Sequence, residues 1–472
     1  MTGMTGASSV LGGLPTVPPN RDDPEHGPTA RRLAGWSAAT RWLAGTGALE
    51  AIMATASVGN RPVLVVDAGA VATRQGAALE RRLRTAVGRD PVDVVTVDRP
   101  PTFDQVRAMS ARWHGLKATG IVAIGGGATM DLAALGALPT DILATPRLAS
   151  GRCGLVLLPS SAQAAILTVM VPTTLGTGAE VSPAACCDHA GDKLLILSEA
   201  LRPRYAAVEP LVTASLPRRQ VADAVVEVLA RILVPFTAVP TEPHPSLTVA
   251  DAVALASLES LATLLARAVD SGFDDDFRIG LATVGAHSHA GWGNIGRNIF
   301  ASPLWFVATE VSTVLGLSKA WATRLCLPVW AASVIAGDRR WGEDGRLSSA
   351  WNRFRHISHG GRVREARTPI NVLQGPTYGL SNFLDALYGD HDAGEAVDAT
   401  GQSQEPQPDL VRRPDPGIVD VIADRLHRRW GAGLPMLGRF THRDLQFFVT
   451  SALAEAAHAK SSGTALRNPE WM

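Results

Sequence analysis

The sequence predicts an N-terminal α/β domain with a parallel, Rossmann-like sheet, followed by an all-α C-terminal domain. Three observations lead to this fold class. Buried-strand patterns alternate with helical patterns up to about Pro210, and one of the strands runs into a three-glycine turn. From Pro217 onward strand patterns fade and apolar residues recur with the period of helices. We assign residues 31–210 to the first domain and residues 211–472 to the second.

The first strand with a functional signal is Pro62–Asp67 (PVLVVD), which is apolar until its final carboxylate. The next is the segment Ile121–Asp131 (IVAIGGGATMD), in which a buried strand meets three glycines and then a helix. A third strand runs into a Thr/Gly loop over Val171–Ser182 (VPTTLGTGAEVS). The remaining segments of the alternating pattern are LERRLRTAV, VDVVTVD, DILAT, GLVLLP, LLILS and YAAVEP.

This order of parts favours a bound dinucleotide. The N-terminus of the helix after the glycines presents unpaired N–H groups and the positive end of the helix dipole to a pyrophosphate. A carboxylate at the position of Asp67 accepts hydrogen bonds from ribose hydroxyls and repels a 2′-phosphate, so NAD is favoured over NADP. The Thr/Gly loop reads equally well, on its own, as a polar surface loop.

Three other segments depart from the alternating pattern. Residues 1–30 are rich in Gly and Pro and predict a disordered leader, and residues 389–417 lack apolar periodicity and predict a flexible insertion. Residues 337–370 are rich in Arg, Trp and His. They form either a lid for a large substrate or an amphipathic helix with Trp351 and Phe354 toward the core, and we favour the helix.

Composition limits the classes of partner. The 472 residues include 44 basic and 44 acidic side chains, so charge makes no case for nucleic acid or an anionic membrane. We find no apolar run of about 18 residues and no signal-peptide pattern, and we therefore expect a cytoplasmic protein. The four cysteines show no metal-ligand spacing and are expected to be free thiols: Cys153, Cys186, Cys187 and Cys326.

The motifs GGGATMD and PTTLGTGAEV resemble those of the iron-containing alcohol dehydrogenase superfamily, which includes glycerol dehydrogenases and dehydroquinate synthases. Each motif has Ala where the family has Ser, at Ala128 and Ala179. The resemblance continues through Gly191–Val225, covers about residues 35–335 and is nearest to the butanol-dehydrogenase-like branch. It implies the dehydroquinate synthase-like fold, at least a dimer, and NAD contacts from Asp67, Gly125, Gly126, Gly127, Asp131, Thr173, Thr174, Thr177 and Lys193.

The family's metal ligands are replaced. It uses an Asp and a His four residues apart on one helix, then the outer histidines of an H-x3-H-x9-H segment. Here those four positions hold Glu227, Arg231, Trp305 and Lys319, with Thr309 at the middle histidine. Iron or zinc needs imidazole or carboxylate donors, and cations repel it. We therefore predict no catalytic metal.

The two cations are predicted to take over the metal's work. Arg231 and Lys319 supply positive charge to a carbonyl or alkoxide and favour an anionic, carboxylate-bearing substrate. Lys319 serves as general acid or base, and Thr309 relays a proton. We expect loss of either cation to abolish turnover and to leave NAD binding nearly unchanged. The alternative is a dead site in which Glu227 and Arg231 pair and Lys319 is solvated.

His287 is the remaining imidazole with a predicted catalytic role, that of a proton relay, although a structural histidine is the simpler reading. Together these features favour a metal-independent, NAD-dependent dehydrogenase of a hydroxy acid. The resemblance extends to daptide-type dehydrogenases of ribosomal-peptide maturation, which implies oxidative decarboxylation of a C-terminal threonine. The alternative is an inactive homologue that binds and stabilises a partner biosynthetic enzyme. A non-redox use of NAD ranks last.

Overall fold

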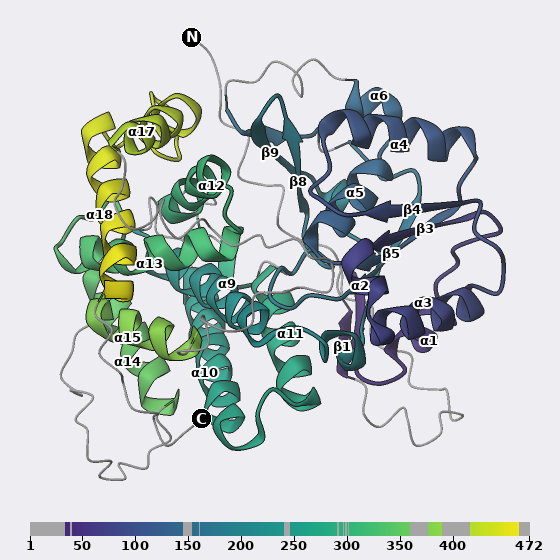
Figure 1. Ribbon diagram of the computed structural model, residues 1–472, viewed down its shortest axis with the longest axis horizontal. Helices are drawn as coiled ribbons and strands as arrows, with labels where there is room; N and C mark the ends of the chain where they lie inside the picture. The colour runs from purple at the N-terminus through teal and green to yellow at the C-terminus, as the bar shows by residue number, and fades with distance from the viewer. Residues whose placement is uncertain are drawn as a thin grey trace. The chain divides into compact units, whose positions relative to one another are not determined.

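The computed structural model describes residues 34–37, 40–144, 153–159, 161–239, 246–289, 292–295, 297, 300, 302–358, 376–388 and 416–461 (Figure 1). The chain is built of two compact units. The first comprises residues 1–151, 155–174 and 178–215, and the second comprises residues 152–154, 175–177 and 216–472. The predicted leader over residues 1–30, and residues 389–415 of the predicted insertion, lie outside the described residues.

The first unit is organised by a seven-stranded sheet. Six neighbouring strands are parallel, and one edge strand is antiparallel. In spatial order the strands are β1 (Ala34–Ser37), β2 (Arg41–Ala44), β10 (Tyr205–Val208), β7 (Leu167–Pro172), β5 (Gly120–Gly125), β3 (Pro62–Asp67) and β4 (Asp93–Val97). The predicted parallel α/β fold is confirmed for this part of the chain.

Helices cover both faces of this sheet (Figure 1). On β3, Val63 and Val65 join the apolar core under α4 (Phe103–Gly115) and α5 (Gly127–Gly136). The alternate residues Leu64 and Val66 join the core under α1 (Ala48–Met53) and α3 (Arg74–Val87). Because successive side chains of a strand point to opposite faces, a strand buried on both sides is apolar throughout, as PVLVV is.

Two predicted strands belong to a different sheet. The GLVLLP and LLILS segments supply β6 (Leu155–Leu157) and β9 (Asp192–Leu197), which pair with β8 (Ala184–His189) in a separate three-stranded sheet. β8 and β9 are antiparallel, so the prediction of parallel strands was wrong for this region. The first three residues of the DILAT segment lie in the short helix α6 (Thr140–Leu143). The remaining short helices of this unit are α2 (Ala68–Ala72), η2 (Glu199–Leu201) and α8 (Pro210–Thr213).

The second unit is helical, with no strand among its described residues, as predicted. Its elements are α9 (Arg218–Thr237), α10 (Ser246–Ser271), α11 (Asp275–His289), η3 (Trp292–Asn294), α12 (Pro303–Leu315), α13 (Lys319–Ile335), α14 (Asp344–Ser358), α15 (Pro376–Tyr388), α17 (Pro416–Trp430) and α18 (His442–Ser461). The central helix α9 contacts α10, α11, α13, α14 and α15, which explains why most of its residues are buried.

One helix of this unit has the length and hydropathy of a membrane span. The segment Leu247–Ser271 of α10 has a mean hydropathy of 1.6, and 28% of its most apolar window is buried. Asp251 on this helix binds Arg346 and Arg297, and Glu259 binds Arg353. These ion pairs and its contacts with α9, α11 and α14 tie α10 to the helical unit.

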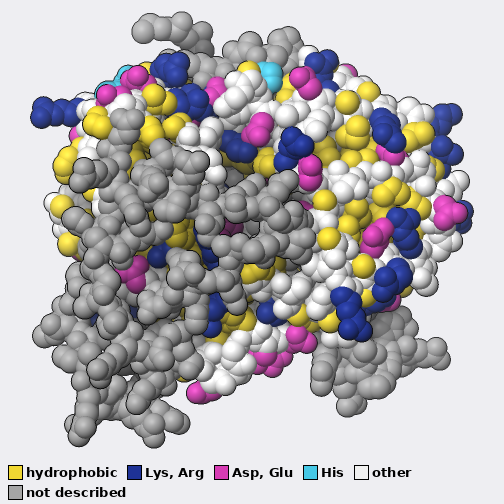
Figure 2. Space-filling model, in the orientation of Figure 1, with side chains coloured by type: hydrophobic (Ala, Val, Ile, Leu, Met, Phe, Trp, Pro, Cys, Tyr) yellow, Lys and Arg dark blue, Asp and Glu magenta, His cyan; other side chains and the backbone are white. Residues whose placement is uncertain are grey.

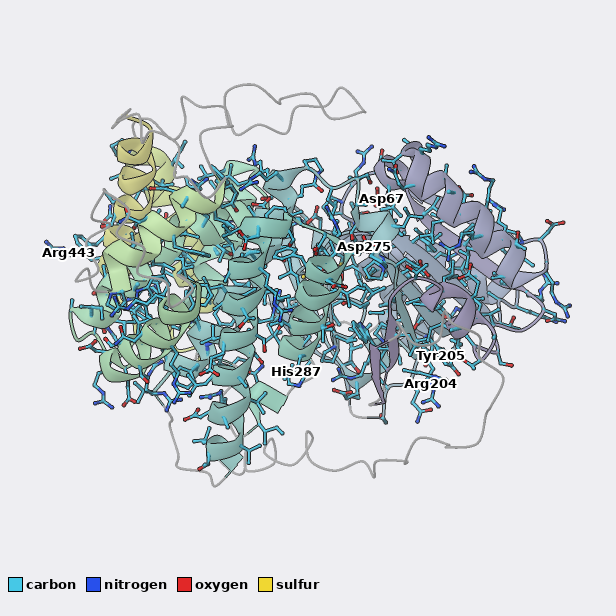
Figure 3. All side chains as sticks on the ribbon, turned by 90° about the horizontal axis from the view of Figure 1, so that it is seen from below. Asp67, Arg204, Tyr205, Asp275, His287 and Arg443 are labelled. Carbon is cyan, nitrogen blue, oxygen red and sulfur yellow. The ribbon has the colours of Figure 1, made fainter. Side chains whose placement is uncertain are left out.

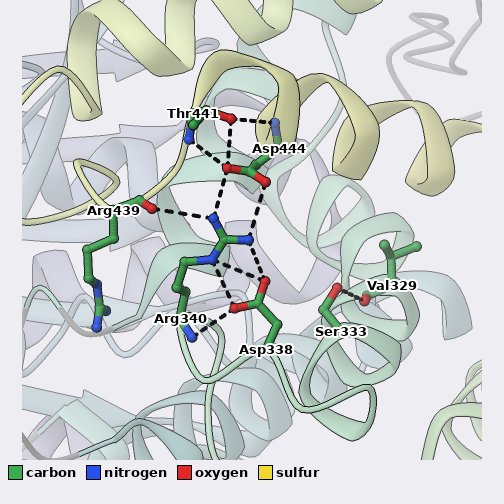
Figure 4. Close-up of polar contacts among 7 residues, drawn as sticks. All are labelled: Val329, Ser333, Asp338, Arg340, Arg439, Thr441 and Asp444. Atoms are coloured by element: carbon green, nitrogen blue, oxygen red, sulfur yellow. Dashed lines mark hydrogen bonds and ion pairs between the residues drawn. The ribbon is translucent and has the colours of Figure 1, made fainter.

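Within residues 337–370, the part over Asp344–Ser358 is helical. Trp351 and Phe354 of α14 are 4% and 1% exposed, as the amphipathic-helix interpretation predicts. Before α14, Arg340 is held by two carboxylates, Asp338 and Asp444, and so ties this turn to the start of α18 (Figure 4). On the face drawn in Figure 2, basic and acidic side chains are interspersed.

Candidate functional site

The glycine turn lies where the sheet reverses its direction of growth. From β3 the chain adds β4 on one side and β5 on the other. Ligands of such sheets bind outside the carboxyl ends of the strands at this switch point. Here β3 ends in Asp67, labelled in Figure 3, and β5 ends in Gly125. A Cβ on Gly125 would stand 2.8 Å from the Cβ of Asp67, so the two predicted nucleotide contacts are neighbours.

The N-terminus of α5 is open to a ligand. Gly126 is its N-cap residue, and no side chain caps its N–H groups. The Thr/Gly loop lies against this turn, because Thr173 N donates to Gly125 O at 3.0 Å and a Cβ on Gly126 would lie 3.2 Å from the methyl group of Thr174. Unpaired helix N–H groups beside two glycines are the arrangement that a pyrophosphate needs.

Three buried hydroxyls support the assignment of a nucleotide. Thr129, Thr174 and Thr177 have buried Oγ1 atoms with no hydrogen-bond partner in the part of the chain that the structure describes. A buried hydroxyl without a partner costs about 1–3 kcal/mol, so such groups normally meet a ligand or water. These residues fit the hydroxyls and phosphates of NAD.

Asp67 has a structural bond as well as its predicted role. Its Oδ1 accepts a hydrogen bond from Ala70 N at 2.8 Å and caps α2. A carboxylate has two oxygens with about four acceptor positions, so the cap leaves capacity for a ribose. The cap holds the carboxylate at the end of β3.

Asp131 and Lys193 lie close to each other on α5 and β9. Burial raises the pKa of Asp131 to about 7, while the Cys186 N–H and the charge of Lys193 act in the opposite direction. The ammonium of Lys193 pairs with Asp188 across the β8–β9 hairpin at 2.6 Å. Their predicted contacts with NAD stay predictions.

In the second unit, Glu227 and Arg231 project from one face of α9, as their spacing predicts. Their closest charged atoms are 3.9 Å apart, and the side chains are 14% and 13% exposed. Burial raises the pKa of Glu227, Asp223 raises it further, and the charges of Arg231 and Lys319 oppose this shift. Glu227 is therefore within electrostatic reach of both cations.

The other three positions complete the cluster. The indole ring of Trp305 has the Arg231 guanidinium 5.5 Å and the Lys319 ammonium 5.4 Å from its centroid. Lys319 Nζ donates to Trp305 O at 2.8 Å and to the Thr309 hydroxyl. Thr309 in turn donates to Trp305 O at 2.7 Å. Lys319 is thus held inside the unit, contrary to the alternative in which it is solvated.

These residues do not fit a divalent metal. Glu227 is the one metal-ligating side chain among the four positions, and indole, guanidinium and ammonium groups have no lone pair to offer a metal ion. Within the described ranges, no three His, Cys, Asp or Glu side chains are grouped so that they can hold a metal ion. The chemistry of this cluster must therefore be explained by the charges of Glu227, Arg231 and Lys319.

His287 lies near the C-terminal end of α11 and is labelled in Figure 3. Its imidazole is partly buried, which lowers its pKa, so the neutral form predominates at neutral pH. No hydrogen bond from His287 to the cluster is found among the described residues, and its catalytic role stays a prediction.

Sequence reasoning missed two features of these sites. Thr129, in the first turn of α5, has one of the unpaired hydroxyls, and its position in GGGATMD is the available signal. The bond from Arg231 Nη1 to Gly176 O, at 2.7 Å, has no local signal, because 55 residues separate its two partners. It links the charged cluster to the Thr/Gly loop.

Comparisons with known proteins agree with the fold and the motifs. Residues 39–210 match the family model for iron-containing alcohol dehydrogenases. A 4-hydroxybutyrate dehydrogenase of Cupriavidus necator is 32% identical over 225 residues, which are 47% of this chain and 56% of the relative. The mitochondrial hydroxyacid-oxoacid transhydrogenase of Homo sapiens is 31% identical over 199 residues, which are 38% of this chain and 42% of the relative. The chain thus spans about half the length of these curated relatives.

A solved structure extends the likeness to the helical unit. The NADH-dependent butanol dehydrogenase A of Thermotoga maritima superimposes with a TM-score of 0.63 and covers 90% of this chain and 98% of its own, at 18% identity. At that identity the likeness concerns the fold. The match to the family model for iron-containing alcohol dehydrogenases lies in the α/β region, which carries both motifs.

Proposed function

We propose that this chain is a metal-independent, NAD-dependent dehydrogenase that oxidises a hydroxy acid. The observation that carries the proposal is the Trp305 ring with Arg231 and Lys319 at 5.5 and 5.4 Å from its centroid, at positions where the family resemblance places metal ligands. Positive charge is retained at this site, while the ligands that would hold a metal are not.

The nucleotide's part in this reaction is limited to one step of chemistry: when bound, NAD⁺ accepts a hydride from the carbinol carbon. The chain's own residues would hold it. Asp67 accepts from the ribose, the open N-terminus of α5 binds the pyrophosphate, and the Thr174 and Thr177 hydroxyls gain partners.

The substrate's alcohol must also lose a proton from oxygen. Lys319 is suited to this because its nitrogen contacts the Thr309 hydroxyl, so the proton can pass through the hydroxyl of Thr309 to the nitrogen of Lys319. In oxidation the neutral amine accepts the proton, and in reduction the ammonium returns it to the alkoxide. A fixed ammonium also stabilises the alkoxide electrostatically, because its position requires no reorganisation during the reaction.

Two cations in one unit favour a substrate that carries its own negative charge. An arginine recognises a carboxylate through parallel N–H groups. The names of the two relatives describe dehydrogenation of 4-hydroxybutyrate and exchange between a hydroxyacid and an oxoacid. We propose a hydroxy acid for this chain on that basis.

The position of the alcohol relative to the carboxylate defines a narrower class of substrate. If the hydroxyl is β to the carboxylate, oxidation gives a β-keto acid, whose carboxylate leaves as CO₂ while the bonding electrons pass to the α-carbon. A C-terminal threonine has this arrangement. Oxidative decarboxylation of a ribosomally made peptide is therefore the specific reaction that we propose to test.

The second candidate is an inactive homologue that stabilises a partner biosynthetic enzyme. One observation favours it: both cations donate to groups of their own chain, Arg231 to Gly176 O and Lys319 to Trp305 O. The buried, unpaired hydroxyls of Thr174 and Thr177 oppose it, because a chain that had lost its nucleotide would gain by replacing them.

Calorimetric titration of the purified chain with NAD and NADP, together with iron and zinc analysis of the same sample, tests the proposal. We expect NAD to bind more tightly than NADP and the protein to contain no stoichiometric metal. Screening 4-hydroxybutyrate, 3-hydroxy acids and Thr-terminated peptides for NADH formation then identifies the substrate. Stoichiometric metal would refute metal independence, and failure to bind either nucleotide would leave the inactive homologue.

A further inference from the structure

We infer that Arg231 is a positioning residue for the Thr/Gly loop of the nucleotide site. This inference rests on the proposed binding of NAD and goes beyond the substrate role that the sequence predicts for Arg231. It replaces the expectation from the sequence that loss of Arg231 leaves NAD binding nearly unchanged. It assigns one guanidinium to two tasks: it supplies charge beside Trp305, and it holds the backbone of the loop at Gly176.

Gly176 occupies a position that only glycine fits. Its φ is +83°, a left-handed conformation, and a Cβ there would lie 2.6 Å from Ala224 Cα on α9. On α11, a Cβ at Gly285 would lie 3.6 Å from Gly176 Cα. At Gly176 the loop therefore packs closely against both helices through backbone atoms, and the glycine has no side chain of its own to anchor this peptide.

The anchor comes from Arg231 instead. Its Nη1 donates to Gly176 O at 2.7 Å, and the guanidinium is kept in place by Glu227, 3.9 Å from Nη2, and by the ring of Trp305. With a side chain only 13% exposed, Arg231 makes this bond largely shielded from water. Hydrogen bonds from a charged donor are stronger than those between neutral groups.

The bond bears on the residues that are predicted to touch NAD. Thr177 follows Gly176 directly, and its buried hydroxyl has no partner among the described residues. Holding the carbonyl of Gly176 fixes the orientation of the peptide that leads into Thr177. If this carbonyl loses its donor, the loop must be ordered by the nucleotide itself, and the ordering cost weakens NAD binding.

The test compares NAD affinity in matched variants by calorimetry. Arg231→Met removes the donor and keeps an unbranched apolar stem, and we expect its Kd for NAD to rise about tenfold to a hundredfold, the range for losing one charge-assisted hydrogen bond. Lys319→Met removes the other cation near Trp305 and is the control. It should leave the Kd for NAD within about twofold, since its bonds are to Trp305 and Thr309.

Two further variants separate positioning from folding. Arg231→Gln keeps a neutral N–H donor and Arg231→Lys keeps a charged one, and each should recover part of the affinity that Arg231→Met loses. Thermal unfolding of the apo proteins identifies any variant that fails to fold. Recovery of affinity by Gln would show that the donor matters as well as the charge.

The outcomes distinguish the two proposals. Wild-type protein that binds no NAD would end the proposed function, whatever the variants do. Wild-type protein that binds NAD, with an Arg231→Met variant of equal affinity, would overturn the positioning role and leave the dehydrogenase proposal standing. Equal losses in Arg231→Met and Lys319→Met would also overturn it, because net charge rather than the loop would then control affinity.

Discussion

Replacing Lys319 with methionine tests whether a fixed cation stabilises the alkoxide in the proposed reaction. The Lys319 nitrogen is held by Trp305 O at 2.8 Å and by the Thr309 hydroxyl, so the ammonium that forms when it takes the alcohol's proton is fixed in position. A unit charge about 4 Å from an alkoxide contributes about 4 kcal/mol at an effective dielectric constant of about 20. Since about 1.4 kcal/mol is a factor of ten in rate, kcat should fall by about a thousandfold.

The assay is the initial rate of NADH formation with the best substrate of the hydroxy-acid screen, at saturating NAD. Lys319→Arg should retain more activity than Lys319→Met, because it keeps the charge. Lys117→Met, which removes a lysine from an exposed position, is the matched control and should retain wild-type activity. A Lys319→Met variant within threefold of the wild-type kcat would refute the argument that this cation stabilises the alkoxide.

Three further predictions concern the nucleotide site and stability. Gly126→Val adds a branched side chain at a position where even a Cβ would lie 3.2 Å from the methyl group of Thr174. Titration calorimetry should therefore show loss of NAD binding, while circular dichroism shows a folded protein. Undiminished binding would place NAD elsewhere. Glu310→Gln removes a fully buried carboxylate that pairs with two arginines of α17, and its free energy of unfolding in urea should fall by about 3–5 kcal/mol. A fall below about 1 kcal/mol would mean that the pair is not buried in solution. Arg340 lowers the pKa of Asp444 from 3.8 to about 2 through hydrogen bonds, so this stabilisation is present above pH 4 and is lost as the pH falls toward 2. The Arg340→Met variant should lose less stability than the wild type over that pH range. Parallel curves of unfolding free energy against pH for the two proteins would contradict the contact in Figure 4.

Much of the first unit could be predicted because its signals are local. A strand such as Pro62–Asp67 is buried on both faces and is therefore apolar throughout, and the glycine turn stands directly between β5 and α5. By contrast, β1 and β2 are four residues each and were not predicted.

The assignment of strands to sheets could not be predicted in the same way. The LLILS segment looks like any buried strand, yet β9 pairs with β6 and β8 rather than with the main sheet. Strand pairing depends on hydrogen bonds between segments far apart in the chain. An apolar pattern reports that a strand is buried and says nothing of its neighbours.

The features of the candidate site also divide into those that local sequence determines and those that depend on contacts between distant segments. The sequence by itself determined which residues stand at the altered positions, and the fixed spacing of a helix was enough to put Glu227 and Arg231 on one face. Only the tertiary structure brought Arg231 and Lys319 to the ring of Trp305 and joined Arg231 to Gly176 O. The physical reason is that helical periodicity acts over a few residues, whereas these contacts depend on how α9, α12 and α13 pack, which no local pattern encodes.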